Sequence, residues 1–167
     1  MNAYDNISVN KHVVAESSLL KATEVGHILS MKCAKDLDNG SIVTRGNFVE
    51  EQVFETADYA AGKKPYLVLT TPIGYNSDRK YYQDEQWFYN AQGEIARCYE
   101  LHVDDVFTVS ENAISGSPEV GKYVEVDGAL YKAVAAAPQT GIVMQVIEQV
   151  NHTNGKAYRI HVESLGM

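Results

Sequence analysis

Turn-forming residues recur at short intervals along this chain, between segments in which apolar and polar side chains alternate. Near the end of the chain, Tyr158, Ile160 and Val162 alternate with charged or polar neighbours. Because successive side chains of a strand point to opposite faces, this alternation predicts a half-buried strand. Repeated signals of this kind are typical of all-β proteins. The pattern therefore constrains the chain to an all-β fold.

The clearest turn signal is Asp127-Gly128, between two alternating segments. A two-residue turn centred on this pair needs positive φ at both positions, which glycine adopts without steric cost. Such a turn would place Val126 opposite Ala129 and Val124 opposite Tyr131. We expect a hairpin with one buried face and one solvated face.

A second pair, Asn39-Gly40, predicts another hairpin, between residues 26–34 and 41–46. Further strands are expected at the segments QVFETA, YLVLTT, ARCYELH, VFTVS and GIVMQVIEQV. Helix is expected only in short pieces, at residues 15–22 and 77–91, because neither segment sustains an apolar stripe with a 3.6-residue period.

These signals predict two small β-rich units, barrel or sandwich-like, with an extended N-terminal arm and little helix. We expect the arm to span residues 1–22, the first unit to span residues 23–115 and the second unit to span residues 116–167. The arm is set apart because its apolar residues are too sparse to form a core of their own.

Composition excludes some partners. The chain has 167 residues, 45% of them hydrophobic and 22% charged, which is ordinary for a globular protein. Its net charge of -8 argues against binding nucleic acid, because phosphate contacts depend on Lys and Arg. No apolar run approaches the roughly 20 residues that span a membrane, and the N-terminus lacks the pattern of a signal peptide. We expect a protein made in a cytoplasm, without a membrane or nucleic-acid partner.

The sequence offers no catalytic constellation. Cys33 and Cys98 are too few for a disulfide framework or a zinc motif and are expected to be buried. The histidines never stand at the i, i+4 spacing of a helical metal site, so no metal site and no cofactor are expected. The adjacent carboxylates Glu50-Glu51 and Asp104-Asp105 would point to opposite faces of a strand and are expected to be solvated. The sequence therefore predicts a protein that is not an enzyme.

Two features of the sequence are not explained by a plain β-domain. Residues 78–94 concentrate aromatic side chains, including Tyr82, Trp87 and Tyr89, which either plug the open end of a barrel or form a contact surface. The N-terminal arm could add a strand to a neighbouring sheet edge. Its candidate contact residues are Tyr4, Ile7, Val9, Val13 and Val14.

The order of several segments carries a resemblance. KDLDNGSIV, VFETADY, PYLVLTTP, the stretch from FYNAQGE to AISG, VGKYVEVDG and YRIHV follow one another from about Lys32 onward. This order resembles small proteins encoded near the major capsid gene of tailed bacteriophages and prophages of Gram-positive bacteria, which are similar to capsid decoration, or cement, proteins. The matching segments are strands and turns.

The resemblance implies a virion protein that binds the outer surface of a capsid lattice and reinforces it. It implies the major capsid protein as partner, a possible homo-oligomer, and no cofactor. Two alternatives stay open. One is another β-rich phage component, of the tail or of head completion. The other is a carbohydrate-binding module that stacks sugars on Tyr82, Trp87 and Tyr89.

Overall fold

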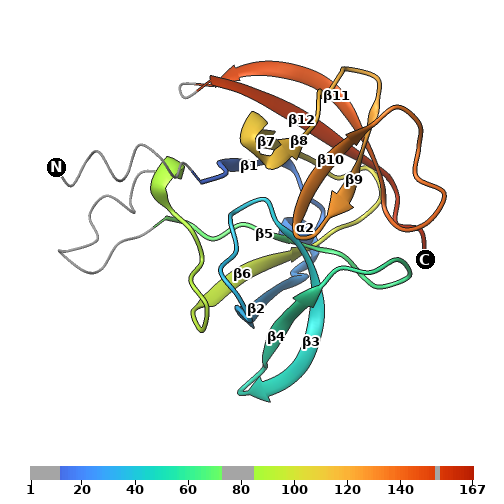
Figure 1. Ribbon diagram of the computed structural model, residues 1–167. Coiled ribbons are helices and arrows are strands. Elements are labelled where there is room, and N and C mark those ends of the chain that lie inside the picture. Colours follow the sequence, from blue (N-terminus) through green and yellow to red (C-terminus); the bar gives the residue numbers. More distant parts are fainter. Residues whose placement is uncertain (1–11, 73–84, 153–154) are drawn as a thin grey trace, which may run out of the picture.

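The computed structural model describes residues 12–72, 85–152 and 155–167 of the chain. Strands predominate in these residues, and helix is confined to one short α-helix and two 3₁₀ turns (Figure 1). The predicted all-β class with little helix is confirmed. In chain order, the elements are β1 (Ala15–Leu19), α2 (Ala22–Val25), β2 (Ile28–Lys32), β3 (Ile42–Glu50), β4 (Val53–Asp58), β5 (Tyr66–Val68), η2 (Glu85–Trp87), β6 (Ile95–Glu100), β7 (Val106–Ser110), η3 (Glu111–Ala113), β8 (Ile114–Ser115), β9 (Tyr123–Asp127), β10 (Leu130–Val134), β11 (Val143–His152) and β12 (Gly155–Ser164).

Five strands close into a barrel, in the order β2-β4-β3-β5-β6. Neighbouring strands are antiparallel except for β2 and β4, which run parallel. Closure removes free strand edges within the barrel. The short strand β5 is buried at every position, so both of its faces are covered.

The remaining strands form a seven-stranded sheet, in the order β1-β7-β12-β11-β9-β10-β8. The long hairpin of β11 and β12 crosses the top of Figure 1. In β12, Tyr158, Ile160 and Val162 are buried, whereas Arg159 and His161 between them are partly exposed. The half-buried strand predicted from this alternation is confirmed.

The barrel is inserted between two neighbouring strands of the sheet. β1 precedes the barrel and β7 follows it, yet β1 and β7 pair with each other. Within the described part of the chain, the strand order therefore requires two passages between the units, at residues 20–27 and at residues 101–105. This division differs from the predicted boundaries, because long-range strand pairing rather than local composition defines the units.

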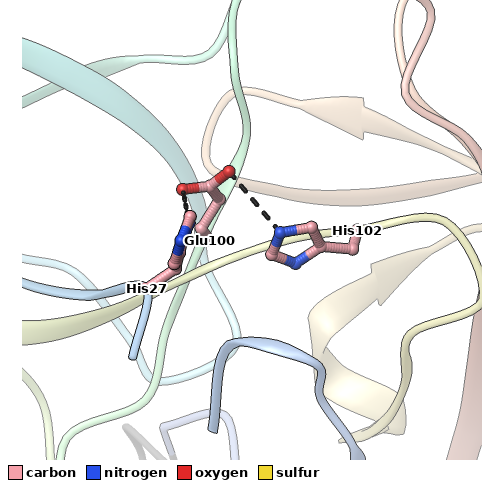
Figure 2. A group of neighbouring side chains, drawn as sticks. All are labelled: His27, Glu100 and His102. Carbon is pink, nitrogen blue, oxygen red and sulfur yellow. Dashed lines mark hydrogen bonds and ion pairs between the residues drawn. The ribbon is translucent and has the colours of Figure 1, made fainter. Parts of the chain in front are cut away.

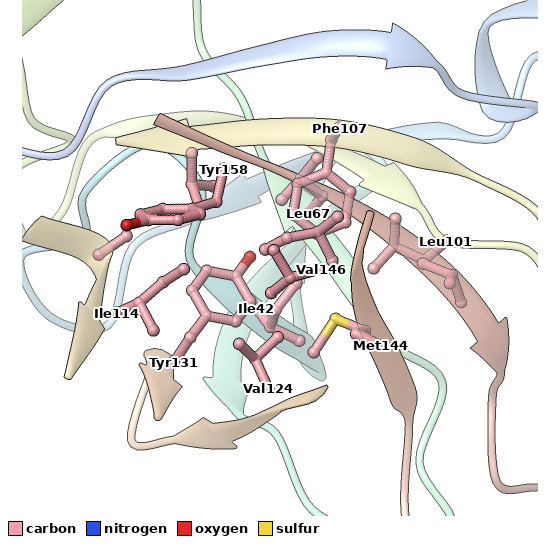
Figure 3. Packing of buried hydrophobic residues seen from close by; sticks show 14 of the residues in the cluster. Ile42, Leu67, Leu101, Phe107, Ile114, Val124, Tyr131, Met144, Val146 and Tyr158 are labelled. Atoms are coloured by element: carbon pink, nitrogen blue, oxygen red, sulfur yellow. The ribbon is translucent and has the colours of Figure 1, made fainter. Parts of the chain in front are cut away.

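One apolar cluster joins the two units. Ile42 and Leu67 of the barrel pack in the same cluster as Phe107, Tyr131 and many other sheet residues (Figure 3). A second, smaller cluster fills the barrel and includes Cys33 and Cys98. The shared cluster indicates that barrel and sheet support each other's folding, because fully burying one aliphatic or aromatic side chain contributes about 1.5–3 kcal/mol.

The predicted hairpin of β9 and β10 forms, but in a different register. Tyr131 pairs with Val126 and Leu130 with Asp127, so the turn is centred on Gly128 and Ala129. Only Gly128 in this turn has positive φ, at 68°. The prediction that Asp127 occupies a central turn position was wrong, because a turn with a single positive-φ position puts the glycine first.

The hairpin predicted at Asn39-Gly40 does not form, because β2 pairs with β4 and β6 rather than with β3. Gly40, with φ 89°, instead lies where the barrel meets the sheet. A Cβ at this position would lie 3.1 Å from Val109 Cγ1 and 3.2 Å from Ala15 Cβ. Glycine is therefore favoured here both by the backbone conformation and by the close approach of the two units.

The described part of the predicted arm belongs to the fold. Val13 and Val14 are buried, and β1 pairs with β7 of the same chain. The backbone N–H of Ser110 donates to the carbonyl of Val14 at 2.9 Å, and the backbone N–H of Val14 donates to the hydroxyl oxygen of Ser110 at 3.0 Å. The expectation that these two valines lie on a docking surface is corrected, because their side chains are buried in the chain's own core. Within the helix candidate at residues 15–22, residues 15–19 form a strand.

Candidate functional site

His27, Glu100 and His102 meet where the chain passes between barrel and sheet (Figure 2). His27 follows the short helix α2, which is capped at its C-terminal end by Gly26 with φ 73°. Glu100 is the last residue of β6, and its N–H donates to the carbonyl of His27 at 3.0 Å. This backbone bond brings together two side chains that are 73 residues apart in sequence.

The Glu100 carboxylate is the centre of this cluster. Its side chain is only 14% exposed, and Oε2 accepts a hydrogen bond from Nδ1 of His27 at 2.9 Å. Oε1 lies 3.1 Å from Nζ of Lys64 and 3.6 Å from Nε2 of His102. Burial raises the pKa of Glu100, but the hydrogen bonds from His27 and Lys64 outweigh burial and lower the pKa below its ordinary value. The carboxylate is therefore ionised at neutral pH.

A buried carboxylate lies behind His102. Asp105 is fully buried, and it accepts hydrogen bonds from the backbone N–H of Lys21 at 3.0 Å and of His102 at 2.8 Å. Its Oδ2 lies 3.9 Å from Nδ1 of His102, a buried ring nitrogen without a hydrogen-bond partner. The expectation that Asp104 and Asp105 are both solvated was therefore wrong for Asp105, which is not on a regular strand.

The three side chains form a donor set that binds metals elsewhere in proteins. One ligand atom from each of His27, Glu100 and His102 lies within 4.8 Å of the others. Two imidazoles and a carboxylate are ligands of Zn²⁺ and of related divalent metals. The sequence reasoning missed this cluster because it looked for helical spacing. Glu100 and His102 stand two residues apart, which places both on one face of an extended segment.

The sequence-predicted contact residues are not brought together by the described structure. Val13 and Val14 are buried, and Trp87 and Tyr89 are half-buried in the segment around η2. Four of the predicted residues lie outside the described residues: Tyr4, Ile7, Val9 and Tyr82. The prediction that these four bind a partner stays a prediction.

The segment around Trp87 is fastened to residues 12–39. The ring of Tyr89 stacks on His12, with ring centroids 4.7 Å apart, and His12 N–H donates to the carbonyl of Gln86 at 2.8 Å. Asn90 is buried and donates to the side-chain oxygen of Asn39 at 3.1 Å. One face of the Tyr89 ring is therefore covered, which leaves less aromatic surface for stacking a sugar.

The two cysteines are free and buried, as predicted. Burial raises the pKa of Cys33 to about 11 and that of Cys98 to about 12. Because the thiolate is the reactive form, neither thiol is a competent nucleophile at neutral pH.

The β3-β4 hairpin carries a pair of aromatic side chains near its free end, of which Phe48 is exposed and Phe54 half-buried. Phe48 is 63% exposed and contacts Phe54 edge to face, with ring centroids 5.7 Å apart. The guanidinium of Arg45 lies 4.7 Å from the centre of the Phe54 ring. The hairpin projects away from the rest of the barrel at the bottom of Figure 1. An exposed phenylalanine beside a stacked arginine is a composition enriched at protein interfaces.

Glu51 and Gln52 form the turn of this hairpin. Glu50 pairs with Val53, and both residues between them have positive φ, 41° and 71°. Positive φ at both central positions fits a two-residue hairpin turn, but it strains residues other than glycine. The turn predicted for Asp127-Gly128 thus occurs at a pair that carries no glycine.

Comparison with known proteins gives no relative: no family model, no curated protein and no solved structure matches this chain. Among the described residues, no helix combines the length and the apolar character needed to cross a membrane.

Proposed function

We propose that this chain is a structural virion protein that binds the outer surface of a tailed-phage capsid and reinforces it. The proposal begins from the order of strand and turn segments that resembles capsid decoration proteins. The structural observation that supports it best is the projecting β3-β4 hairpin, with Phe48 exposed at its end. A projecting hairpin with an exposed aromatic side chain is suited to insertion between subunits of a lattice, because buried aromatic residues dominate binding energy at interfaces.

The strained turn of this hairpin also supports a binding role for the hairpin. Glycine at Glu51 or Gln52 would relieve backbone strain, yet the chain carries larger polar residues there. Strained positions of this kind concentrate at binding and catalytic sites. In the proposed complex, the side chains of Glu51 and Gln52 contact the polar rim around the site of Phe48.

The net charge of -8 suits a position outside the shell, away from packaged DNA. The major capsid protein is the proposed partner. Repetition of the lattice, and a symmetric oligomer of this chain if one forms, would let a weak single contact suffice, because linked contacts raise the effective concentration.

The proposed N-terminal contact now concerns the residues before His12. Deleting residues 2–20 would remove Val13, Val14 and β1, and with them part of the core. Deleting residues 2–11 leaves these elements in place. The shorter deletion therefore separates attachment from folding.

The experiment is co-sedimentation with capsids of the phage that encodes the chain, after removal of the resident protein. We compare the full chain, the deletion of residues 2–11, Phe48→Ser and Val120→Ser. Val120 is 58% exposed but lies outside the hairpin, so it is the matched control for loss of an exposed apolar residue. We expect Phe48→Ser and the deletion each to raise the concentration needed for saturation, and Val120→Ser to leave it unchanged.

If the full chain does not bind capsids at all, the proposed function is wrong. If it binds instead to tail or neck structures in electron micrographs, the alternative of a tail or head-completion component is the better description. A carbohydrate-binding role has less support, because His12 covers one face of Tyr89. Retention on cell-wall polysaccharide that is lost in Trp87→Ala would favour it.

A further inference from the structure

We propose that His27, Glu100 and His102 form a binding site for a divalent transition-metal ion, with Zn²⁺ as the metal that best matches the ligands. The proposal is independent of where the chain binds on a virion. It rests on the geometry of the three side chains, on the buried carboxylate behind His102 and on the exposure of the site to solvent.

The distances are close to those of a metal site. Two ligands at about 2.1 Å from a tetrahedral Zn²⁺ ion are about 3.4 Å from each other. His27 Nδ1 lies 2.9 Å from one oxygen of Glu100, and His102 Nε2 lies 3.6 Å from the other. The two distances end on different carboxylate oxygens, so binding through one oxygen requires the three ligand atoms to draw together from separations of at most 4.8 Å. The side chain of His27 is 50% exposed and can rotate to make this approach.

Asp105 supplies a second carboxylate behind the ligand His102. If Nε2 of His102 donates its lone pair to the metal, the ring proton must lie on Nδ1. Nδ1 is buried without a hydrogen-bond partner and faces Oδ2 of Asp105 at 3.9 Å. Metal-bound histidines commonly donate their second ring N–H to a carboxylate, which orients the ring and strengthens the ligand. A metal at Nε2 would fix the proton on Nδ1, and a shift of the ring that shortens the 3.9 Å separation would let this N–H donate to Asp105.

Lys64 opposes the metal. Its ammonium group lies 3.1 Å from Oε1 of Glu100, so it occupies part of the volume and neutralises part of the charge that a cation needs. The Lys64 side chain is about half exposed and can turn into solvent when a divalent ion replaces it. The site therefore has a built-in competitor, whose removal should strengthen binding. Three protein ligands leave a fourth position for water.

The test uses the full chain, stripped with a chelator and dialysed, and titrated with Co²⁺ as the spectroscopic probe and then with Zn²⁺ by calorimetry. We expect one saturable site and a visible Co²⁺ spectrum of tetrahedral intensity. Glu100→Gln and His102→Ala should each weaken binding by at least about tenfold. Lys64→Met should tighten it roughly three- to tenfold, because a nearby positive charge is removed.

His161→Ala is the matched control. His161 is also partly exposed and lies 3.1 Å from a carboxylate oxygen, that of Asp104, but it belongs to β12 and not to the cluster. We expect the His161→Ala variant to bind the metal as tightly as the parent chain does.

Asp105→Asn should weaken metal binding and lower the intensity of the Co²⁺ spectrum, since Asp105 positions His102 without contacting the metal.

The proposal is overturned if no saturable binding occurs, or if His161→Ala weakens binding as much as Glu100→Gln does. It is also overturned if Lys64→Met fails to tighten binding. If His102→Ala does not fold, Glu100→Gln and Lys64→Met still test the proposal. Glu100 and Lys64 form one ion pair, yet the proposal requires that Glu100→Gln weakens metal binding and that Lys64→Met tightens it.

Discussion

The hydroxyl of Tyr131 ties the sheet to the barrel, and its removal gives a defined prediction. Tyr131 is fully buried, and its O–H donates to the backbone carbonyl of Gly40 at 2.5 Å. Burial raises the pKa of Tyr131 well above its ordinary value, so the hydroxyl remains a donor throughout the working pH range. Tyr131→Phe keeps the ring and its packing near Phe107, and deletes only this bond (Figure 3).

The size of the expected loss in stability depends on the Gly40 carbonyl, which has lost the Tyr131 hydroxyl as its donor. A typical hydrogen bond contributes about 0.5–1.5 kcal/mol to stability, whereas a buried acceptor without a partner costs about 1–3 kcal/mol. Because the Gly40 carbonyl stays buried, we expect Tyr131→Phe to lower the free energy of unfolding by about 1–3 kcal/mol. For a chain of this length, the melting temperature should fall by about 2–12 °C.

Urea denaturation followed by fluorescence and by circular dichroism provides the measurement, with unchanged slope expected because the same surface is exposed. Tyr123→Phe is the control, since the hydroxyl of this half-exposed tyrosine on β9 makes no hydrogen bond within the described residues. If Tyr131→Phe and Tyr123→Phe have the same midpoint as the parent chain, the hydroxyl does not connect barrel and sheet in the way argued.

Four other substitutions test separate features. Gly128→Val should destabilise by about 1–3 kcal/mol in urea denaturation, because φ at Gly128 is 68° and a β-branched residue is strained there, although a Cβ would meet open space. Gln52→Gly should stabilise by about 0.5–1 kcal/mol in the same assay by relieving positive φ, and no gain would mean that the turn is not strained. Asp105→Asn should destabilise by about 2–3 kcal/mol, because a buried carboxylate accepting two backbone N–H bonds is replaced by an amide that can accept them less well. The pKa of Glu100 is lowered in the folded state, so the contribution of this carboxylate to stability is present above pH 4.5 and is lost as pH falls through the lowered pKa. Glu100→Gln should therefore flatten the fall in melting temperature between pH 6 and pH 3, at about the range where Glu titrates. An unchanged pH profile of the melting temperature would contradict this.

Strand positions were predictable from the sequence, because alternation of side chains is a local property. The segments around Phe54, Tyr66 and Ile160 were all expected as strands and all form them. Register was less predictable. At the β9-β10 hairpin the sequence placed the turn one residue early, because Asp-Gly pairs suit turns with two positive-φ positions and this turn has only one.

Pairing between distant strands could not be read from the chain. Asn39-Gly40 carries a strong hairpin signal, but the residues around it join barrel to sheet. The pairing of β1 with β7 likewise closes over about 90 residues, and no local pattern encodes it. Residues 1–22 were therefore expected to form an arm whose apolar residues are too sparse for a core, although Val13, Val14 and Leu20 are buried.

The candidate metal cluster was hidden for a related reason. Glu100 and His102 share a face of the chain, which the sequence does indicate, but His27 joins them only because β2 pairs with β6. Asp105 was expected to be solvated, and nothing near it in the sequence signals that the N–H groups of Lys21 and His102 would surround it. Spacing rules find metal sites within one helix or loop and fail for sites assembled across strands.

The two passages between barrel and sheet meet at Asp105. One of its carboxylate oxygens binds the backbone at Lys21, in the passage into the barrel, and the other binds the backbone at His102, in the passage out of it. The proposed ligands His27 and His102 belong to the same two passages. A metal ion held by both histidines would add a second cross-link at this junction, beside the shared apolar cluster. Since the β3-β4 hairpin lies on the barrel and the long β11-β12 hairpin on the sheet, such a cross-link would stiffen the connection through which a force on one unit reaches the other.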